Sequence, residues 1–369
     1  MNQPLWNDHP WDALPPLETD ITCDLCVIGL GGSGLAAILE GLEQGASVIG
    51  LDAIGIGAGA AGRNGGFVLA GLASFYHEDV AQHGRSRAAK MYGATLEEIE
   101  RLRTLTPNDI RHTGSLRIAM SSDELEDCAL QKMALEADGF PVESYEGIEG
   151  IGLLFPADCA MNPLARVRNL ARLAISKGAR LFESSKALEI KTGLVSGEKF
   201  LIRAQKIIVA VDGKLEGIFP ELKVRTARLQ MLGTAPCEPR FARPVYARFG
   251  YEYWQQLPDG RIVLGGFRDQ FEQAEWTFED SPSKNLQARL EDFLRTDLGV
   301  TSEITHRWAA SVSYSSGLLP VLEQVQENVW ALGGYSGTGN VVGSIFGRMA
   351  AQLALQGHSG LSNVFSRTP

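Results

Sequence analysis

The stretch from Cys26 to Asp52 constrains the fold of this chain more than any other. An apolar strand ends at Ile28, the turn Gly29-Leu30-Gly31-Gly32-Ser33-Gly34 follows, and an amphipathic helix then leads to a second strand that ends at Asp52. In this G-x-G-x-x-G pattern the first glycine allows a tight turn, the second admits a pyrophosphate, and the third lets helix and strand pack closely. Free N–H groups at the helix start attract phosphates. The pattern predicts a dinucleotide-binding βαβ unit, with Asp52 placed for ribose hydroxyls. The alternative is a glycine-rich turn of another α/β protein.

Composition narrows the function classes. The 369 residues, 44% of them hydrophobic, allow a large core in two domains or one large domain. The net charge of -10 disfavours nucleic acid, because phosphate binding needs a basic face. No apolar run is long enough to cross a bilayer, and the N-terminal stretch lacks signal-peptide features, so we expect a cytoplasmic protein without a membrane span. Cys23 and Cys26 would point to opposite faces of one strand, so we expect core residues and no metal site.

Two further glycine-rich stretches frame the rest of the chain. Residues 54–66 are too rich in glycine and alanine for a regular helix or strand, and Arg63-Asn64 among these glycines indicates a ligand contact rather than a flexible loop. Residues 333–340 form a second such loop before a helix predicted over 341–355. Between them, Asn162-Pro163 predicts a helix start, and Lys206–Val211 predicts a buried strand that runs into Asp212-Gly213.

Three motifs in this order resemble the D-amino-acid oxidase superfamily of FAD enzymes, and within it the γ-glutamylputrescine oxidase and glycine oxidase-like members. The resemblance implies an α/β fold of the glutathione-reductase and D-amino-acid-oxidase type. A Rossmann-like, doubly wound FAD-binding domain would comprise residues 1–80, 150–224 and 305–369. A mixed-sheet α+β substrate domain would comprise residues 81–149 and 225–304.

The resemblance also implies an FAD site. The ADP half would be held by Gly29, Gly31, Gly32, Ser33, Gly34 and Asp52, with Lys186 or Ala187 against the adenine and Gly213 at the second strand end. The flavin half would meet Ala60, Gly62, Arg63, Asn64, Gly65 and Gly66, then Gly334, Tyr335, Ser336, Gly337, Thr338 and Gly339. The helix after this last loop would stabilise the negative charge of reduced flavin. Sarcosine oxidase-like relatives attach FAD to a cysteine near residues 308–313, but no cysteine follows Cys237, so we expect non-covalent FAD and no metal.

The implied activity is oxidation of a primary or secondary amine to an imine by hydride transfer to flavin N5, followed by hydrolysis to an aldehyde or keto acid. Tyr253 and Tyr335 are the candidate catalytic residues; Trp254 alternates to the other face of its strand. Val312 stands where glycine oxidase-like members carry the arginine that pairs with the substrate carboxylate. Arg228 or Arg268 remain as other sources of that arginine. This departure favours a γ-glutamylputrescine-like amine, with a small amino acid second.

The sequence does not determine the electron acceptor. Val263 stands where related oxidases carry an oxygen-activating lysine, so either oxygen or another acceptor takes the electrons. The alternative functions are a catalytically silent flavin-binding scaffold or redox sensor, and an NAD-dependent dehydrogenase. The oligomeric state is unknown.

Overall fold

The computed structural model describes residues 2–8, 10–317 and 319–366, and the chain forms two compact units. The first unit comprises Met1–Asp8, Arg63–Pro163 and Ala227–Ser311, and the second comprises His9–Gly62, Leu164–Thr226 and Val312–Pro369. Among the described residues, no helix combines the length and the hydrophobicity that crossing a bilayer requires. The division of cofactor and substrate binding between the predicted domains stays a prediction.

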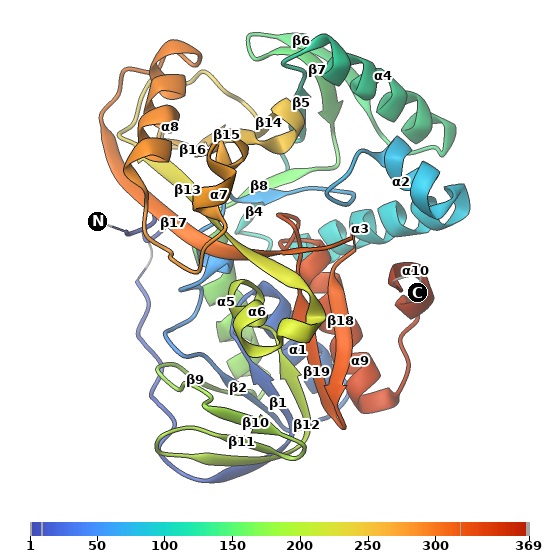
Figure 1. The fold of residues 1–369 in the computed structure, drawn as a ribbon, viewed down its shortest axis with the longest axis vertical. Helices are drawn as coiled ribbons and strands as arrows, with labels where there is room; N and C mark the ends of the chain where they lie inside the picture. Colours follow the sequence, from blue (N-terminus) through green and yellow to red (C-terminus); the bar gives the residue numbers. More distant parts are fainter. Residues whose placement is uncertain (1, 9, 318, 367–369) are drawn as a thin grey trace. The chain divides into compact units, whose positions relative to one another are not determined.

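The second unit is built on an eight-stranded mixed sheet (Figure 1). Its parallel strands are β1 (Ile21–Ile28), β2 (Val48–Leu51), β9 (Arg180–Phe182), β12 (Leu201–Val209) and β19 (Val329–Gly333). The antiparallel strands β10 (Glu189–Lys191), β11 (Leu194–Ser196) and β18 (Val321–Gln326) extend it. Most of β1 is buried, as expected for parallel strands covered on both faces. The unit's helices are α1 (Gly32–Glu43), α5 (Pro163–Ser176), α6 (Leu215–Ile218), α9 (Val342–Gln356) and α10 (Ser362–Phe365).

Helices α1 and α9 pack directly on each other, and glycine makes the contact possible. A Cβ on Gly347 would lie 2.1 Å from the carbonyl oxygen of Ser33, which is closer than any real contact. At the far end of the same contact, Arg348 Nε lies 3.2 Å from a carboxylate oxygen of Glu40. The second unit therefore contains the N-termini of both helices, α1 and α9, and also the glycine turn that precedes α1.

The first unit contains most of a second eight-stranded sheet, in the order β17-β13-β16-β15-β14-β5-β7-β6. These strands are β5 (Ser115–Ile118), β6 (Glu143–Gly147), β7 (Gly150–Phe155), β13 (Val224–Thr234), β14 (Val245–Ala247), β15 (Glu252–Gln256), β16 (Ile262–Gly266) and β17 (Ile304–Ser315). A small sheet joins β3 (Phe67–Val68), β8 (Cys159–Met161) and β4 (Ile110–Arg111). The helices are α2 (Tyr76–His83), α3 (Arg85–Leu105), α4 (Ser122–Ala137), α7 (Glu272–Glu275) and α8 (Lys284–Thr296).

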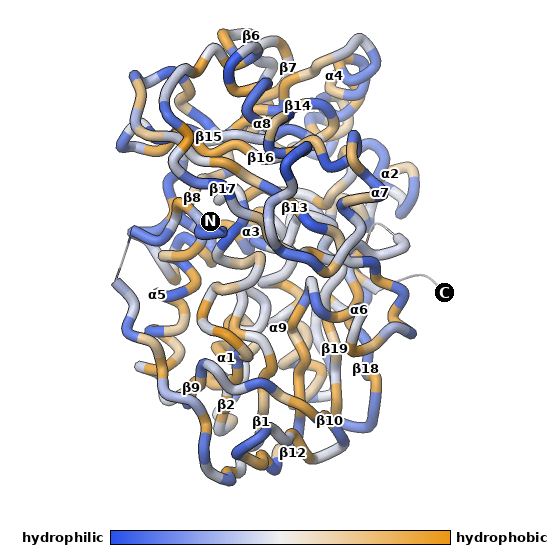
Figure 2. Tube along the Cα trace, turned by 60° about the vertical axis from the view of Figure 1, so that its left-hand side comes forward, coloured by the Kyte–Doolittle hydropathy of each residue, from blue (hydrophilic) through white to orange (hydrophobic). Residues whose placement is uncertain are grey.

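Two hydrophobic clusters stabilise this unit. One packs the apolar face of α8 against the sheet, with Leu290 and Phe293 against Trp254 and Leu264. The hydrophobic colour at β16 in Figure 2 follows this burial. The other cluster lies among α2, α3 and α4 and is rich in aromatic side chains. The two clusters leave one face of β14 and β15 to meet other parts of the first unit.

Local signals in the sequence predicted several of these elements. The helix predicted from Asn162-Pro163 is α5. The residues Pro258-Asp259-Gly260 predict a hairpin turn, and in the structure they connect the antiparallel strands β15 and β16. The sequence pattern of residues 245–249 predicts one strand over this whole range, and this prediction is wrong in extent because β14 ends at Ala247. Arg248 and Phe249 have φ angles of 47° and 57°, which no strand accommodates. The Arg248 guanidinium binds the carboxylates of Glu252 and Asp269, and these contacts stabilise the turn.

Candidate functional site

The glycine turn of the second unit leaves space where a pyrophosphate is predicted. Gly29 has a φ of +99°, and a Cβ there would lie 2.5 Å from the carbonyl oxygen of Ala210. A Cβ on Gly34 would lie 1.9 Å from the carbonyl oxygen of Gly29. At Gly31, by contrast, a Cβ would meet one described atom within 4 Å, the Cβ of Ala61 at 3.3 Å. The first and third glycines therefore serve the chain's own packing, whereas the second keeps an open approach to the backbone.

Positive charge gathers at this turn. Helix α1 begins at Gly32 without a capping side-chain hydrogen bond from Gly31 and without an acidic residue in its first turn, so neither of these usual partners satisfies its N-terminal N–H groups. The guanidinium of Arg166, which is 2% exposed, reaches to 4.0 Å from the ideal Cβ position of Gly32. Arg166 could not be predicted from the sequence, because no motif marks it within α5. Helix N–H groups and a buried cation fit the two phosphates of FAD.

Asp52, predicted to bind the ribose, also holds the glycine turn. Its carboxylate accepts hydrogen bonds from the backbone N–H groups of Leu30 at 3.0 Å and of Ile54 and Gly55 at 2.9 Å. Burial raises the pKa of Asp52, the three N–H groups lower it, and the charge of Glu183 raises it further. The carboxylate thus connects the end of β2 to the turn. Its ribose contact stays a prediction.

Glu183, directly after β9, was also missed. Its carboxylate accepts hydrogen bonds from Trp11 Nε1 at 3.1 Å, from Leu14 N at 2.5 Å and from Ile56 N at 2.5 Å. The N-terminal arm and the loop after β2 are therefore held by one acid. An acid at the carboxyl end of a parallel strand was the available signal.

The third glycine stretch is organised by Asp212 at the end of β12. Its carboxylate accepts hydrogen bonds from Ser313 N at 3.1 Å, Ser313 Oγ at 2.9 Å and Gly334 N at 2.9 Å. Burial raises the pKa of Asp212, and these donors lower it. Gly334 and Gly337 have φ angles of +72° and +95°, so both need glycine. This role of Asp212 was not predicted from the sequence, although an acid directly after a buried strand is a signal in itself.

The predicted loop of residues 334–339 leads into α9. This helix, like α1, has no capping side chain and no acid in its first turn. The ring of Tyr335 is buried against Gly339 and Gly343, whose ideal Cβ positions lie 3.4 and 3.5 Å from ring atoms. The other predicted cofactor residues of this unit are Gly213, buried in a 3-10 turn, Ala60 and Gly62, in the 3-10 turn Ala60–Gly62, and Ala187, partly buried against the core. Their roles, like the catalytic role of Tyr335, stay predictions.

The predicted flavin loop of residues 63–66 is held in place by the first unit. Trp308 Nε1 donates to the carbonyl oxygen of Arg63 at 2.7 Å, and Trp6 Nε1 donates to that of Asn64 at 2.8 Å. Gln255 Nε2 donates to the carbonyl oxygen of Gly65 at 2.5 Å. Gly66 has a φ of +77°, and a Cβ there would lie 2.3 Å from a backbone oxygen. Three large side chains thus hydrogen-bond to the backbone of residues 63–65, which the glycines of this loop do not cover with side chains of their own.

Tyr253 lies beside this loop, in an aromatic wall formed by Phe67, Tyr246 and Tyr253. The tyrosine rings stack with centroids 5.8 Å apart, and Phe67 meets Tyr246 and Tyr253 edge-on at 5.0 and 5.9 Å. The ideal Cβ of Gly65 lies 3.3 Å from Cδ2 of Tyr253. Trp254 points to the opposite face and packs on Phe293, as strand alternation predicts. The catalytic role of Tyr253 stays a prediction.

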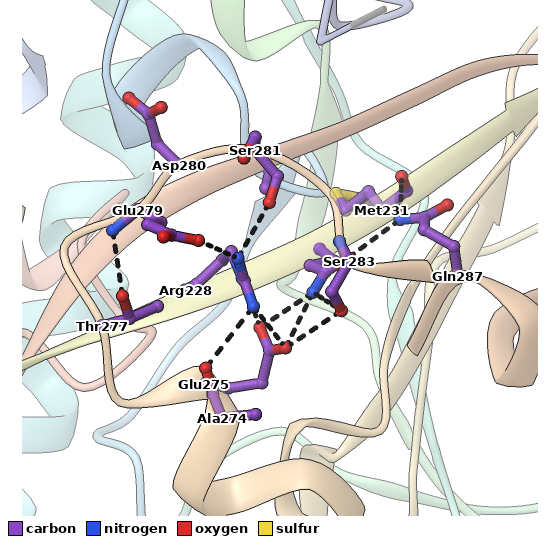
Figure 3. Close-up of polar contacts among 12 residues, drawn as sticks. Arg228, Met231, Ala274, Glu275, Thr277, Glu279, Asp280, Ser281, Ser283 and Gln287 are labelled. Carbon is purple, nitrogen blue, oxygen red and sulfur yellow. Dashed lines mark hydrogen bonds and ion pairs between the residues drawn. The ribbon is translucent and has the colours of Figure 1, made fainter. Parts of the chain in front are cut away.

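Arg228 is engaged in a buried ion pair (Figure 3). Its Nε and Nη2 donate to the two carboxylate oxygens of Glu275 at 2.8 and 2.9 Å. Gln230 Nε2 donates to the same carboxylate at 2.9 Å, and Arg228 Nη1 donates to the carbonyl oxygen of Ser281 at 3.1 Å. Arg228 is 5% exposed and Glu275 is fully buried. Arg228 is therefore a structural residue rather than a substitute carboxylate clamp. Arg268, the other candidate, lies over the ring of Trp276 at 4.8 Å.

Comparison with known proteins agrees with this architecture. The family profile described as FAD dependent oxidoreductase (DAO) matches residues 24–353. The chain is 26% identical over 398 residues to gamma-glutamylputrescine oxidoreductase of Escherichia coli, which covers 98% of this chain and 89% of that protein. It is 27% identical over 374 residues to the probable oxidoreductase OrdL of Rhizobium meliloti, which covers 93% and 85%.

Solved structures show the same fold. Glycine oxidase from Geobacillus kaustophilus matches with a TM-score of 0.77 at 16% identity over 94% of this chain and 99% of that one. L-proline dehydrogenase from P. horikoshii matches with a TM-score of 0.75 at 16% identity over 93% and 96%. The predicted fold class and FAD cofactor are thereby confirmed, and the NAD-dependent alternative is not supported. Because the family profile spans nearly the whole sequence, this chain belongs to the DAO family of FAD-dependent oxidoreductases.

Proposed function

We propose that this protein oxidises a primary or secondary amine to an imine, which water then hydrolyses to an aldehyde or keto acid and ammonia or an amine. When bound, FAD supplies the acceptor for the hydride that leaves the carbon bearing the amine. The first substrate candidate is a γ-glutamylputrescine-like amine, as the name of the Escherichia coli relative suggests, and the second is a small amino acid.

The aromatic wall of the first unit is the observation that carries this proposal. Phe67, Tyr246 and Tyr253 together present rings and phenol groups without a formal charge beside Gly65. A surface of this kind removes water from a bound amine. Loss of water disfavours the ammonium and favours the neutral amine, which is the form that can lose hydride. The wall therefore binds and orients the reacting amine without needing a strong acid or base.

The arginines favour an amine over a simple α-amino acid. An α-amino acid carries its carboxylate next to the reacting carbon, and a bidentate arginine is the usual partner for it. Val312 stands at the position where that arginine is expected, and Arg228 is committed to Glu275. A substrate whose carboxylate lies far from the reacting carbon, or is missing, suits this site better.

The cofactor contacts follow from the same placements. We assign the pyrophosphate to the open backbone at Gly31, the N-terminus of α1 and Arg166, and the flavin's polar edge to the loop of residues 334–339 with the N-terminus of α9. The loop of residues 63–66 and Tyr253 are the proposed flavin neighbours in the first unit. Cys23, Cys26, Cys128 and Cys159 are buried, and burial raises the pKa of these thiols. The fifth cysteine, Cys237, donates from Sγ to the carbonyl oxygen of Gly260 at 3.5 Å, and no cysteine follows it in the sequence. FAD is therefore expected to be held without a covalent bond.

An anaerobic absorbance experiment tests the proposal. The purified holoenzyme is mixed with a panel of aliphatic amines, polyamine derivatives and amino acids, and the oxidised flavin band is followed. Bleaching by one amine supports the proposal, and readmission of air then separates an oxidase from an enzyme that uses another acceptor. If every amine leaves the flavin oxidised while dithionite reduces it, the protein is a catalytically silent flavoprotein and the proposal is wrong.

A further inference from the structure

A polar pocket in the first unit adjoins the aromatic wall. It lies among α2, α3, α4, β5 and the loop after β3. Tyr246 belongs both to the wall and to the lining of this pocket. The pocket also contains the side chains of Arg117, Asp79, Asp158 and Gln131. None of these four has a role in the amine oxidation proposed above.

Strand register places Arg117 in line with the wall. Tyr253 on β15 is paired with Tyr246 on β14, and Tyr246 is paired with Arg117 on β5. Residues paired across neighbouring strands point to the same face of a sheet, and neighbouring strands lie about 4.8 Å apart. The backbones of Arg117 and Tyr253, two strand spacings apart, therefore lie about 10 Å from each other across the sheet. Its guanidinium rests 4.2 Å above the ring of Phe75 and, among the described residues, forms no ion pair within 4 Å.

Acceptors for a cation line the same pocket. Asp79 is 3% exposed, and its carboxylate accepts a hydrogen bond from the hydroxyl of Ser74. Gln131 is 4% exposed, and its Oε1 has no hydrogen-bond partner among the described residues. A buried carbonyl oxygen without a donor is unfavourable, and a ligand N–H group in the pocket would satisfy it. Asp158 differs, because Ala70 N at 2.8 Å and Ser115 Oγ at 2.6 Å already satisfy it.

The electrostatics agree with this reading. Burial raises the pKa of Asp79 and of Asp158 to about 7 each, and Arg117 lowers both. A buried carboxyl of this kind is stabilised in its charged form when an ammonium group binds next to it. The pocket thus combines one cationic group with acceptors that favour a cation.

We propose that the substrate carries an α-amino-acid head group at the end remote from the oxidised amine, with its carboxylate on Arg117 and its ammonium group on Asp79 and Gln131. This inference rests on the proposed amine oxidation and names its substrate class. A chain that spans about 10 Å in extended form contains about eight or nine bonds, since an extended backbone advances about 3.3–3.6 Å per three bonds. A small amino acid is too short to contact Tyr253 and Arg117 together, whereas an acylated diamine is long enough.

Three acyl derivatives of 1,4-diaminobutane test the assignment with the holoenzyme. The γ-glutamyl derivative has both head-group charges, the glutaryl derivative lacks the ammonium group, and the butanoyl derivative lacks both. We expect kcat/KM to fall about 10- to 100-fold at each step, because each step removes a charge-assisted hydrogen bond. Arg117→Met should abolish the difference in kcat/KM between the glutaryl and the butanoyl derivative. Asp79→Asn or Gln131→Leu should abolish the difference in kcat/KM between the γ-glutamyl and the glutaryl derivative. Equal kcat/KM values for the three compounds would overturn the inference.

A binding measurement separates this inference from the proposed function. N5-butylglutamine has the head group but no amine to oxidise, so its affinity for the holoenzyme, measured by calorimetry, does not depend on turnover. We expect binding to wild type and to the control Arg103→Met, and at least tenfold weaker binding to Arg117→Met. If Arg117→Met does not fold, Arg117→Lys takes its place, because it keeps the charge but loses the bidentate geometry. Absence of binding to wild type, or equal binding to wild type and the Arg117 variant, refutes the head-group site. Binding without oxidation of any amine refutes the proposed function alone.

Discussion

Replacing Arg228 by methionine tests whether the buried pair in Figure 3 is structural. Arg228 Nε and Nη2 hold both oxygens of Glu275, and the pair is nearly inaccessible to solvent. Methionine keeps much of the side-chain volume but leaves the Glu275 carboxylate with Gln230 and Ser283 as donors. Removing one partner of a buried ion pair costs about 3–5 kcal/mol, because the remaining charge stays desolvated. At about 2 °C or more per kcal/mol for a large domain, we expect the melting temperature to fall by at least about 6 °C.

Thermal unfolding of the holoenzyme, followed by tryptophan fluorescence, measures this loss. The matched control is Arg103→Met, which removes an arginine from an ion pair with Glu100 whose side chains are 36% and 67% exposed. Such surface pairs contribute about 0–1 kcal/mol, so the control should melt within about 2 °C of wild type. The double variant Arg228→Met/Glu275→Leu should recover part of the stability, because it removes both buried charges together.

A catalytic role for Arg228 predicts the opposite pattern. If Arg228→Met melts like wild type but raises KM for carboxylate-bearing substrates and not for plain amines, Arg228 binds substrate and the structural reading is wrong. If the variant loses stability while KM for both substrate classes is unchanged in the folded fraction, the pair is structural. The two readings therefore give different results in the same two assays.

Three further predictions concern the cofactor loops and the pocket. Gly34→Ala would place a methyl group 1.9 Å from the carbonyl oxygen of Gly29, so we expect the variant to lose FAD on purification. In the control Gly93→Ala, in α3, the added methyl group meets no atom within 4 Å, and the free energy of unfolding should rise by about 0.5–1 kcal/mol. A flavin-replete Gly34→Ala protein would contradict the packing argument. Burial raises the pKa of Asp158 from 3.8 to about 7, so its contribution to stability is complete below pH 3.8 and is lost as pH rises through 7. Melting temperatures of wild type should therefore fall more steeply between pH 4 and 7 than those of Asp158→Asn, and parallel profiles would refute this assignment. Asp212→Ala leaves two buried N–H groups without an acceptor and should cost at least about 2 kcal/mol in urea unfolding, whereas a loss below 0.5 kcal/mol would show that water replaces the carboxylate.

Features that depend on a few neighbouring residues could be predicted from the sequence. The glycine turn, the start of α5 at Pro163 and the hairpin between β15 and β16 were all found, because each needs a particular backbone conformation that only certain residues adopt. The opposite directions of Tyr253 and Trp254 follow in the same way from strand alternation. The family could be recognised because three such local motifs stand in a particular order.

Features that depend on distant partners could not be predicted. Arg228 was a candidate substrate arginine until the fold placed it on Glu275, and Arg166 had no motif to mark its approach to Gly32. The pairing of Arg117 with Tyr246 depends on the parallel register of β5 and β14, which no local pattern encodes. A charged side chain can be a surface group, a buried structural pair or a ligand contact. Burial and the nearest opposite charge decide among these, and both arise only when segments far apart in the chain come together.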